Sequence, residues 1–516
     1  MAHVTLIKPP MVILRLVQSR ATCPPLGIAY LAGSLRFVEH EVDVIDGVGE
    51  AIFQFTKINN DQNIGHGLTL DEVVDRIDPQ TDFICLSTMF SIEWPYDYQL
   101  IKKIKLKFPD KPIIIGGEHV TAAADWILKN CDEVDYCIVG EGEAKLVSLI
   151  NFLSGYDDTF DSNGIVSRSL TRPIREGAVD KYLMKLRIKS VDDIPLPAWD
   201  LIPLNNYLDN NFGYGVDRGR NMPMLATRGC PYQCTFCSNP QMWSTKWVAR
   251  EPVKVLDEME TYLRDYKIEN FSFYDLTAIV KRDWIITFCN LILERNLKFT
   301  WQLPSGTRSE AFDSEVIDLM YKTGCTNLNF APESGSPAVL KRIKKKVDLS
   351  AMKNAMRNCL NRGMVVKSNT IIGFPGETHF EIWQTLKFIA QISWIGVHEA
   401  TISGYVPYPG TEIYDNLRKD KILPEFSNEY FWSLSTSSDI FNRSSFSKHI
   451  SNRAITYYSI IGLLLFYGIS VIRRPNFFIK SLYNVLLGKK EESRMEATIR
   501  AIFNRFNPFR RKKTYL

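Results

Sequence analysis

One short stretch carries the strongest signal: Thr227-Arg228-Gly229-Cys230-Pro231-Tyr232-Gln233-Cys234-Thr235-Phe236-Cys237, with three cysteines in a C-x3-C-x2-C spacing. Cys230, Cys234 and Cys237 could wrap one [4Fe–4S] cluster on a single loop at a strand's end. Because the cluster has four irons, three ligands leave one iron open to bind and activate another molecule. Zinc is the alternative, but structural zinc takes four ligands and the next cysteine is Cys289. The spacing therefore favours an open iron–sulfur cluster.

Outward from this loop, between about residues 216 and 425, strand and helix patterns alternate six times. Such βα units in series predict a partial TIM-like (βα)6 barrel with its chemistry on the loops after the strands. The predicted strands are Pro223–Thr227, Phe271–Tyr274, Phe299–Gln302, Asn327–Ala331, Val365–Ile372 and Ala400–Val406.

Residues 1–150 form a second alternating series, which predicts a doubly wound, Rossmann-like parallel sheet covered on both faces. Such a sheet binds ligands outside the carboxyl ends of its strands. Small residues at those ends would let a bulky planar ligand approach the backbone, although ordinary tight turns explain them as well. The predicted strands are Val4–Lys8, Glu41–Asp46, Asp82–Ser87, Pro112–Ile115 and Val134–Val139.

The remaining segments have a different character. Residues 151–215 are rich in Asp, Asn, Gly and Pro, which predicts a connector, and residues 426–516 predict a helical C-terminal region. Ala454–Ile472 contains no formal charge over a length close to that of a membrane span. Its tyrosines, serines and glycines favour a buried or interfacial helix over a true span. Basic groups follow at Arg473-Arg474, Lys489-Lys490 and Arg510–Lys513.

Composition narrows the class of protein. The 516 residues are 45% hydrophobic and 23% charged, with a net charge of +4. These values describe an ordinary globular protein and give no reason to expect a nucleic-acid partner. Seven of the ten cysteines are scattered, which argues against a disulfide framework and for a reducing compartment. The N-terminus lacks the pattern of a signal peptide, so we expect a cytoplasmic protein, with membrane association through 454–472 as an open alternative.

The cysteine loop, including Phe236 before the third cysteine, closely resembles that of the radical S-adenosylmethionine (SAM) superfamily. The resemblance implies that the open iron chelates the amino and carboxylate groups of SAM. An electron from the reduced cluster would then cleave SAM to a 5′-deoxyadenosyl radical. Residues 1–150 resemble the cobalamin-binding domain of the same subgroup, through Pro24–Ala32, Gly116–His119 and Gly140–Glu143. The implied cofactors are a [4Fe–4S] cluster, SAM and cobalamin.

The resemblance also implies contacts to SAM after later strands of the barrel. Glu333 and Ser334 resemble the ribose-binding element, and the turn at Gly373 resembles the segment that packs against adenine. Glu333 as an ordinary carboxylate at a helix N-terminus is the alternative. Arg308 could pair with the SAM carboxylate, or could form a surface salt bridge. The subgroup often carries two acidic residues after the second strand, whereas here Asp275 stands alone, which puts any role of the pair in doubt.

For cobalamin, the resemblance points to the strand ends at Ser87-Thr88, Gly116-Gly117 and Glu141. No D-x-H-x-x-G sequence supplies a histidine ligand to cobalt. His119 is the remaining candidate, and a turn histidine more often makes an ordinary hydrogen bond. We therefore expect the lower face of the corrin against Ser87, Thr88 and apolar neighbours.

The subgroup resemblance suggests C-methylation at an unactivated carbon, with a ring-forming or other radical rearrangement as the second hypothesis. No side chain need act as a nucleophile, because the cofactors carry the chemistry. Transfer-RNA methylthiolation would need a second cysteine trio, and Cys23, Cys85, Cys131 and Cys137 are too scattered for one. A non-catalytic iron–sulfur module is the remaining alternative. We expect a small-molecule or lipid-like substrate and an external flavodoxin- or ferredoxin-like electron donor.

Overall fold

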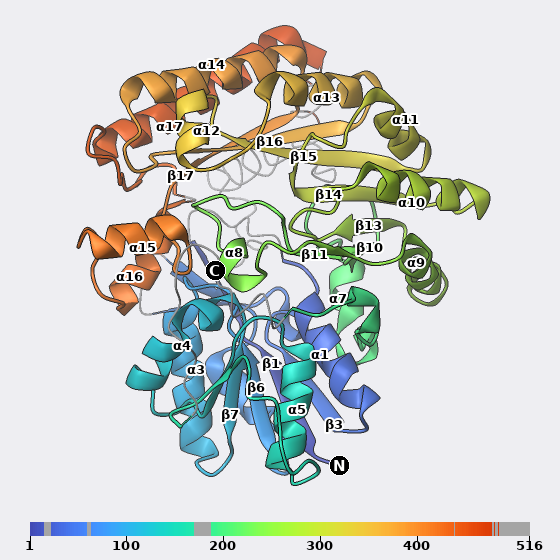
Figure 1. The fold of residues 1–516 in the computed structure, drawn as a ribbon, viewed down its shortest axis with the longest axis vertical. Helices are drawn as coiled ribbons and strands as arrows, with labels where there is room; N and C mark the ends of the chain where they lie inside the picture. Colours follow the sequence, from blue (N-terminus) through green and yellow to red (C-terminus); the bar gives the residue numbers. More distant parts are fainter. Residues whose placement is uncertain are drawn as a thin grey trace. The chain divides into compact units, whose positions relative to one another are not determined.

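The computed structural model describes residues 1–14, 22–58, 63–169, 187–437 and 439–476, with 479 and 483. The chain forms two compact units (Figure 1). The first comprises 1–210, 229–249 and 407–435, and the second comprises 211–228, 250–406 and 436–516. The cysteine loop therefore belongs to the first unit, although residues 211–228, which precede it in sequence, belong to the second.

The first unit is built on a six-stranded sheet in the order β3-β1-β6-β7-β8-β9. The first five strands are parallel, and β9 runs antiparallel to β8. The order reverses between β1 and β6, so a topological switch point lies at the carboxyl ends of these two strands. The strands are β1 (His3–Lys8), β3 (Glu41–Asp46), β6 (Phe83–Ser87), β7 (Ile113–Gly116), β8 (Tyr136–Ile138) and β9 (Ile165–Val166).

The strands of this sheet are nearly continuous apolar runs, so both faces of the sheet have to be covered by helices. In β1, for example, Val4, Leu6 and Ile7 are fully buried. The larger helices are α1 (Leu26–Phe37), α3 (Trp94–Lys107), α4 (Glu118–Asn130) and α5 (Glu143–Leu153). Shorter helices are α2 (Leu70–Asp75), α7 (Leu204–Leu208), α8 (Asn239–Met242), α15 (Glu412–Lys419) and α16 (Asn428–Ser433). A small antiparallel sheet contains β2 (Met11–Leu14), β5 (Asn63–His66) and β4 (Phe55–Lys57), and β12 (Val248–Ala249) follows the cysteine loop.

The second unit is a six-stranded parallel sheet in the sequential order β10-β13-β14-β15-β16-β17, as in a partial barrel (Figure 1). The strands are β10 (Asn221–Met224), β13 (Asn270–Phe273), β14 (Thr300–Thr307), β15 (Cys325–Glu333), β16 (Val365–Ile372) and β17 (Glu399–Gly404), with β11 (Thr227–Arg228) after β10. The helices are α9 (Pro252–Tyr266), α10 (Arg282–Glu294), α11 (Ser314–Lys322), α12 (Pro337–Arg342), α13 (Leu349–Asn361), α14 (His379–Ile395) and α17 (Asn452–Arg473).

Alternation along these strands separates an apolar face from a polar one. On β13, Phe273 packs against Phe288 of α10. The preceding Ser272 instead donates a hydrogen bond to Asn221 on β10, at 2.9 Å, and accepts one from Gln302 on β14, at 3.0 Å. The helices therefore cover the apolar face, and the opposite face joins neighbouring strands through buried hydrogen bonds.

The predicted fold class is confirmed: an α/β sheet domain, a parallel partial barrel and a helical C-terminal region. Two differences are the antiparallel edge strand β9 and the small β2-β5-β4 sheet, neither of which was predicted. Of the basic groups after α17, Lys489-Lys490 and Arg510–Lys513 lie outside the described residues.

Candidate active site

The cysteine loop is a compact turn inside the first unit. The backbone N–H of Cys237 donates to the carbonyl of Cys234 at 3.1 Å, which brings the second and third thiols onto one turn. The side-chain amide of Asn239, at the start of α8, donates to the carbonyl of Cys230 at 3.1 Å. All three cysteines carry free thiols. The loop thus offers three soft sulfur ligands, a donor set that suits an iron–sulfur cluster.

A glycine allows the chain to enter this loop. Gly229 has φ +85°, a left-handed conformation that L side chains rarely adopt, and an added Cβ would collide with the carbonyl of Lys246. Phe236, which was predicted to contact the cofactor, is half-buried next to the third cysteine. The geometry of the loop therefore depends on glycine immediately before the first cysteine.

The loop is fastened to the turn that follows β7. Ser238, directly after the third cysteine, donates a hydrogen bond to the carboxylate of Glu118. Burial raises the pKa of the Glu118 carboxyl above its ordinary value, because desolvation disfavours the charged form. Glu118 is a residue whose role sequence reasoning missed, even though its Gly-Gly-Glu-His turn was recognised.

Glu141 provides a second connection. Its carboxylate accepts a hydrogen bond from the backbone N–H of Ile188 at 2.8 Å, and the guanidinium of Arg187 lies 3.6 Å away. Arg187 lies over the ring of Trp243, 5.3 Å from its centroid, in the segment that follows the cysteines. Glu141 was predicted to bind a cofactor; the structure places it in a buried ion pair that supports the cysteine loop. No sequence signal marked Arg187.

The predicted corrinoid contacts gather at two neighbouring strand ends of the sheet. Ser87 ends β6 beside the switch point, and the N–H of Thr88, the next residue, donates to the carbonyl of Gly116 at 2.8 Å. Gly117 has φ +126°, and a Cβ there would collide with the carbonyl of Thr88. Phe90, in the loop after Thr88, exposes 48% of its surface. This edge combines close backbone packing with an exposed aromatic ring, which suits the apolar face of a planar ligand.

His119 is fully buried. Its Nδ1 lies 2.9 Å from the hydroxyl of Ser91, and its ring contacts Trp94 and Phe431. Burial lowers the pKa of His119 to about 3, so the ring is neutral. The structure therefore shows for His119 the ordinary hydrogen-bonding role that was the alternative to cobalt coordination.

In the second unit, Glu333 ends β15 with φ +65°, an uncommon conformation for a residue other than glycine. Its buried carboxylate accepts from the ammonium of Lys345 at 2.9 Å. Ser334 next to it is fully buried, and its hydroxyl lies 3.0 Å from that of Thr385 on α14. Of the two predicted ribose contacts, Ser334 is used in packing, and Glu333 is held in place by a lysine that sequence reasoning missed.

Arg308 lies after β14. It donates to Glu310 at 2.7 Å and to the carbonyl of Lys346, and only 5% of its surface is exposed. The salt bridge considered for Arg308 therefore joins a buried guanidinium to an exposed carboxylate. Lys346 follows Lys345, the partner of Glu333, so Arg308 and Glu333 meet the same short segment.

Gly373 and Asp275 have roles in shaping the chain. The N–H of Gly373 donates to the carboxylate of Glu377 at 2.5 Å, and burial raises the pKa of Glu377 to about 7. The buried carboxylate of Asp275 accepts from the backbone of Ala226 and from Thr227, directly ahead of the cysteine loop. Burial raises the pKa of Asp275 to about 6. The lone acid after the second strand thus orders the strand end that leads to the cysteines.

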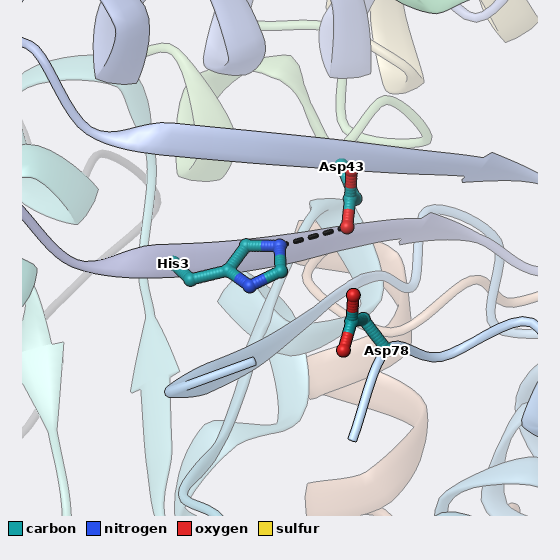
Figure 2. Close-up of side chains that lie close together, drawn as sticks. All are labelled: His3, Asp43 and Asp78. Atoms are coloured by element: carbon teal, nitrogen blue, oxygen red, sulfur yellow. Dashed lines mark hydrogen bonds and ion pairs between the residues drawn. The ribbon is translucent and has the colours of Figure 1, made fainter. Parts of the chain in front are cut away.

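A further group of metal-ligand types lies at the start of β1. Figure 2 shows the His3 ring facing the carboxylate of Asp43, at 2.7 Å, with Asp78 beside them. One ligand atom from each lies within 4.8 Å of the others, and both carboxylates are exposed. This is a hydrogen-bonded His–Asp pair with a neighbouring acid, at the opposite end of β1 from the switch point.

Two family profiles match the chain. The Radical SAM superfamily matches residues 224–389, and the B12 binding domain matches residues 13–150. A switch-point α/β domain, a parallel partial barrel and a three-cysteine loop define a corrinoid- and SAM-dependent iron–sulfur enzyme. The chain belongs to the cobalamin-binding radical SAM enzymes, which confirms the predicted family and the predicted cofactors.

Among curated relatives, the chain is 28% identical to "Uncharacterized methyltransferase PH0819" from Pyrococcus horikoshii, over 78% of this chain and 80% of that one. It is 27% identical to cytidylyl-2-hydroxyethylphosphonate methyltransferase from Streptomyces wedmorensis, over 78% and 79%. Among solved structures, the methyltransferase TsrM from Kitasatospora setae, with cobalamin and a [4Fe–4S] cluster bound, matches with a TM-score of 0.60 and 17% identity, over 81% and 75%. The cobalamin-dependent enzyme OxsB matches with a TM-score of 0.62 and 15% identity, over 98% and 75%.

Proposed function

We propose that this enzyme is a C-methyltransferase that acts at an unactivated carbon. The observation that carries the proposal is the combination of an open three-cysteine loop and a corrinoid-type switch point in one chain. The relatives named above support methyl transfer as the reaction. When bound, the cluster with SAM supplies a carbon-centred radical and cobalamin supplies the methyl group.

The chain's own residues position these groups. We assign Cys230, Cys234 and Cys237 to the cluster, and Glu333 to the ribose hydroxyls of SAM, because an ionised carboxylate accepts hydrogen bonds. Lys345 holds that carboxylate in place. Arg308 is assigned to the carboxylate of SAM, which would have to share its guanidinium with Glu310.

Cobalamin is assigned to the switch point in the first unit. Ser87 and Thr88 would meet the lower face of the corrin, with the Gly116-Gly117 turn beside them. Glu141 supports the cluster loop through Arg187 and is therefore a positioning residue. The assignment leaves His119 out of the cobalt coordination, in accord with its buried ring.

The test is the stoichiometry of SAM consumption by anaerobically reconstituted enzyme with hydroxocobalamin, a reductant and candidate substrates. We expect one S-adenosylhomocysteine and one 5′-deoxyadenosine for each methylated product. Cys230→Ala should abolish 5′-deoxyadenosine formation and leave cobalamin bound, whereas Cys289→Ala, which removes the next cysteine along the chain, should retain both. Methylated product without S-adenosylhomocysteine would contradict the proposal.

Radical ring formation or rearrangement without methyl transfer is the second candidate. It is favoured by a relative named anaerobic magnesium-protoporphyrin IX monomethyl ester cyclase, from Rubrivivax gelatinosus, to which the chain is 24% identical over 76% of its length and 66% of that chain. The same assay separates the two: cyclisation would give 5′-deoxyadenosine and no S-adenosylhomocysteine.

The partners follow from this chemistry. We propose a small-molecule or lipid-like substrate, an external one-electron donor of the flavodoxin or ferredoxin kind, and no nucleic acid. None of the ten cysteines forms a disulfide, which fits a reducing setting. Helix α17 is long and apolar enough to cross a membrane, with a mean hydropathy of 1.9. Peripheral contact through 454–472 is therefore part of the proposal.

A further inference from the structure

Helix α17 has an unusual distribution of side chains for a helix packed on a soluble domain. The residues that it buries are largely small or polar: Ser459, Gly462 and Ser470, with Ile455 and Phe466. Between its charged ends, the large side chains that it exposes are Tyr457 (63%), Ile461 (39%), Leu464 (70%) and Ile472 (77%). A helix in contact with water normally shows the reverse pattern.

Small residues on the buried face let α17 approach the domain closely. A Cβ on Gly462 would collide with Ile402 of β17 and lie 2.9 Å from Leu386 of α14. The hydroxyl of Ser393 on α14 donates to the carbonyl of Phe466 at 2.6 Å, and Arg474 donates to the carbonyl of Val397 at 2.7 Å. The helix is thus attached along its length and cannot span a bilayer independently of the domain.

Helix α14 extends the exposed apolar surface. Figure 1 shows α14 and α17 in the same layer, in direct contact. The outer side of α14 exposes Phe380 (71%), Trp383 (52%) and Trp394 (60%). The ring of Trp383 meets that of Tyr458 edge-on, which joins the two helices into one surface. We call the exposed side chains of Phe380, Trp383, Trp394, Tyr457, Ile461, Leu464 and Ile472 the α14–α17 face.

The charges around this face are complementary to an anionic surface. Lys387 on α14, and Arg453 and Arg473 at the ends of α17, are all exposed. In the sequence, the segment 473–516, from the last residue of α17 onward, contains twelve Lys and Arg against three Glu, a net charge of +9, whereas the whole chain carries only +4. Tryptophan and tyrosine favour the lipid interface, and cations beside apolar groups bind anionic headgroups.

We propose that the α14–α17 face docks on the surface of an anionic lipid bilayer, with α17 lying in the plane of the interface. The large apolar side chains that α17 exposes favour a lipid neighbour over water. The exposed cations Lys387, Arg453 and Arg473 favour an anionic lipid surface over an apolar protein groove. The inference rests on the peripheral contact proposed above, for which it names the surface and the class of lipid, and it does not depend on the reaction that the enzyme catalyses.

The test is flotation of the full chain with vesicles of phosphatidylcholine, with and without phosphatidylglycerol. We expect binding that strengthens with phosphatidylglycerol and weakens with salt. Trp394→Asp with Leu464→Asp should lower the partition coefficient roughly a hundredfold, because two apolar anchors become charged. The control is Leu106→Asp, the same change at an exposed apolar side chain of α3, which should bind as the unaltered chain does.

Both altered positions are exposed, so the variants should keep their far-UV circular dichroism and bound iron. Equal vesicle binding by the double variant and the unaltered chain would overturn the proposal. So would a dimer in solution that the double variant converts to a monomer, because the face would then join two copies. Resistance to alkaline carbonate extraction would also overturn it, since an interfacial helix is released and a spanning one is not.

Discussion

At the scale of single residues, Gly117 sets the backbone shape of the strand ends that we propose bind the corrinoid. Its φ of +126° with ψ of −177° lies in a region that essentially only glycine occupies, and a Cβ would strike the Thr88 carbonyl. Gly117→Ala should therefore destabilise the fold by at least about 2 kcal/mol and abolish hydroxocobalamin binding, measured by absorbance. Gly468→Ala, in α17, is the control, because a Cβ there meets nothing within 4 Å. Equal cobalamin affinity in both variants would contradict this assignment.

Burial of His119 should make the free energy of unfolding depend on pH. Its pKa is lowered to about 3 by burial, against an ordinary value of 6.5, so between these values the unfolded chain binds more protons than the folded one. Stability should consequently fall as pH drops from 6.5 towards 3, with a slope of up to about 1.4 kcal/mol per pH unit. His119→Phe keeps an aromatic ring beside Trp94 and Phe431 and should flatten this slope. The measurement is the denaturant midpoint of both proteins across this pH range; parallel curves would contradict the prediction.

At the scale of the element, α17 contains two glycines, and only Gly462 packs closely against the rest of the second unit. Gly462 faces Ile402 and Leu386, whereas a Cβ at Gly468 meets nothing within 4 Å. Gly462→Leu should lower the free energy of unfolding by about 1–3 kcal/mol through overpacking. Gly468→Leu, in the same helix, should be neutral or raise it by up to about 0.8 kcal/mol through helix propensity. The measurement is the thermal unfolding midpoint of the two variants. Equal shifts of the midpoint would mean that α17 is not packed closely at Gly462.

The elements that sequence reasoning located well are those with a strong local period. β16 has its predicted bounds, Val365–Ile372, because β-branched and apolar residues fill a long strand before a Gly-Phe-Pro-Gly turn. The β2-β5-β4 sheet was missed because strands of three or four residues carry too little periodicity. The sequence also could not predict that α17 buries small residues and exposes large apolar ones. A helix whose only charged residues lie at its ends gives no pattern that shows which side contacts the protein.

At the scale of the molecule, long-range contacts decide how the site is assembled, and these contacts leave no local trace in the sequence. The cysteine spacing predicted the three ligands, but nothing near them in the sequence indicates that Glu118 and Arg187 support their loop. Glu333 was recognised by its place after a strand, whereas its partner Lys345 lies on a different segment. The chemistry could thus be predicted from motifs, and the supporting contacts could not.

The pairing of Glu141 with Arg187 makes retention of the cluster depend on a residue from the cobalamin-binding sequence. Both side chains are buried, so Glu141→Ala leaves the guanidinium without this partner beside Trp243. The expected cost is about 3 kcal/mol of unfolding free energy, with a lower content of iron and sulfide after reconstitution. Glu141→Leu with Arg187→Met removes both charges and should recover much of the stability, because a buried ion pair can be replaced by apolar groups of similar volume. If Glu141→Ala keeps its full cluster content and thermal midpoint, the ion pair does not support the loop, and the turn held by Glu118 and Ser238 remains its main attachment.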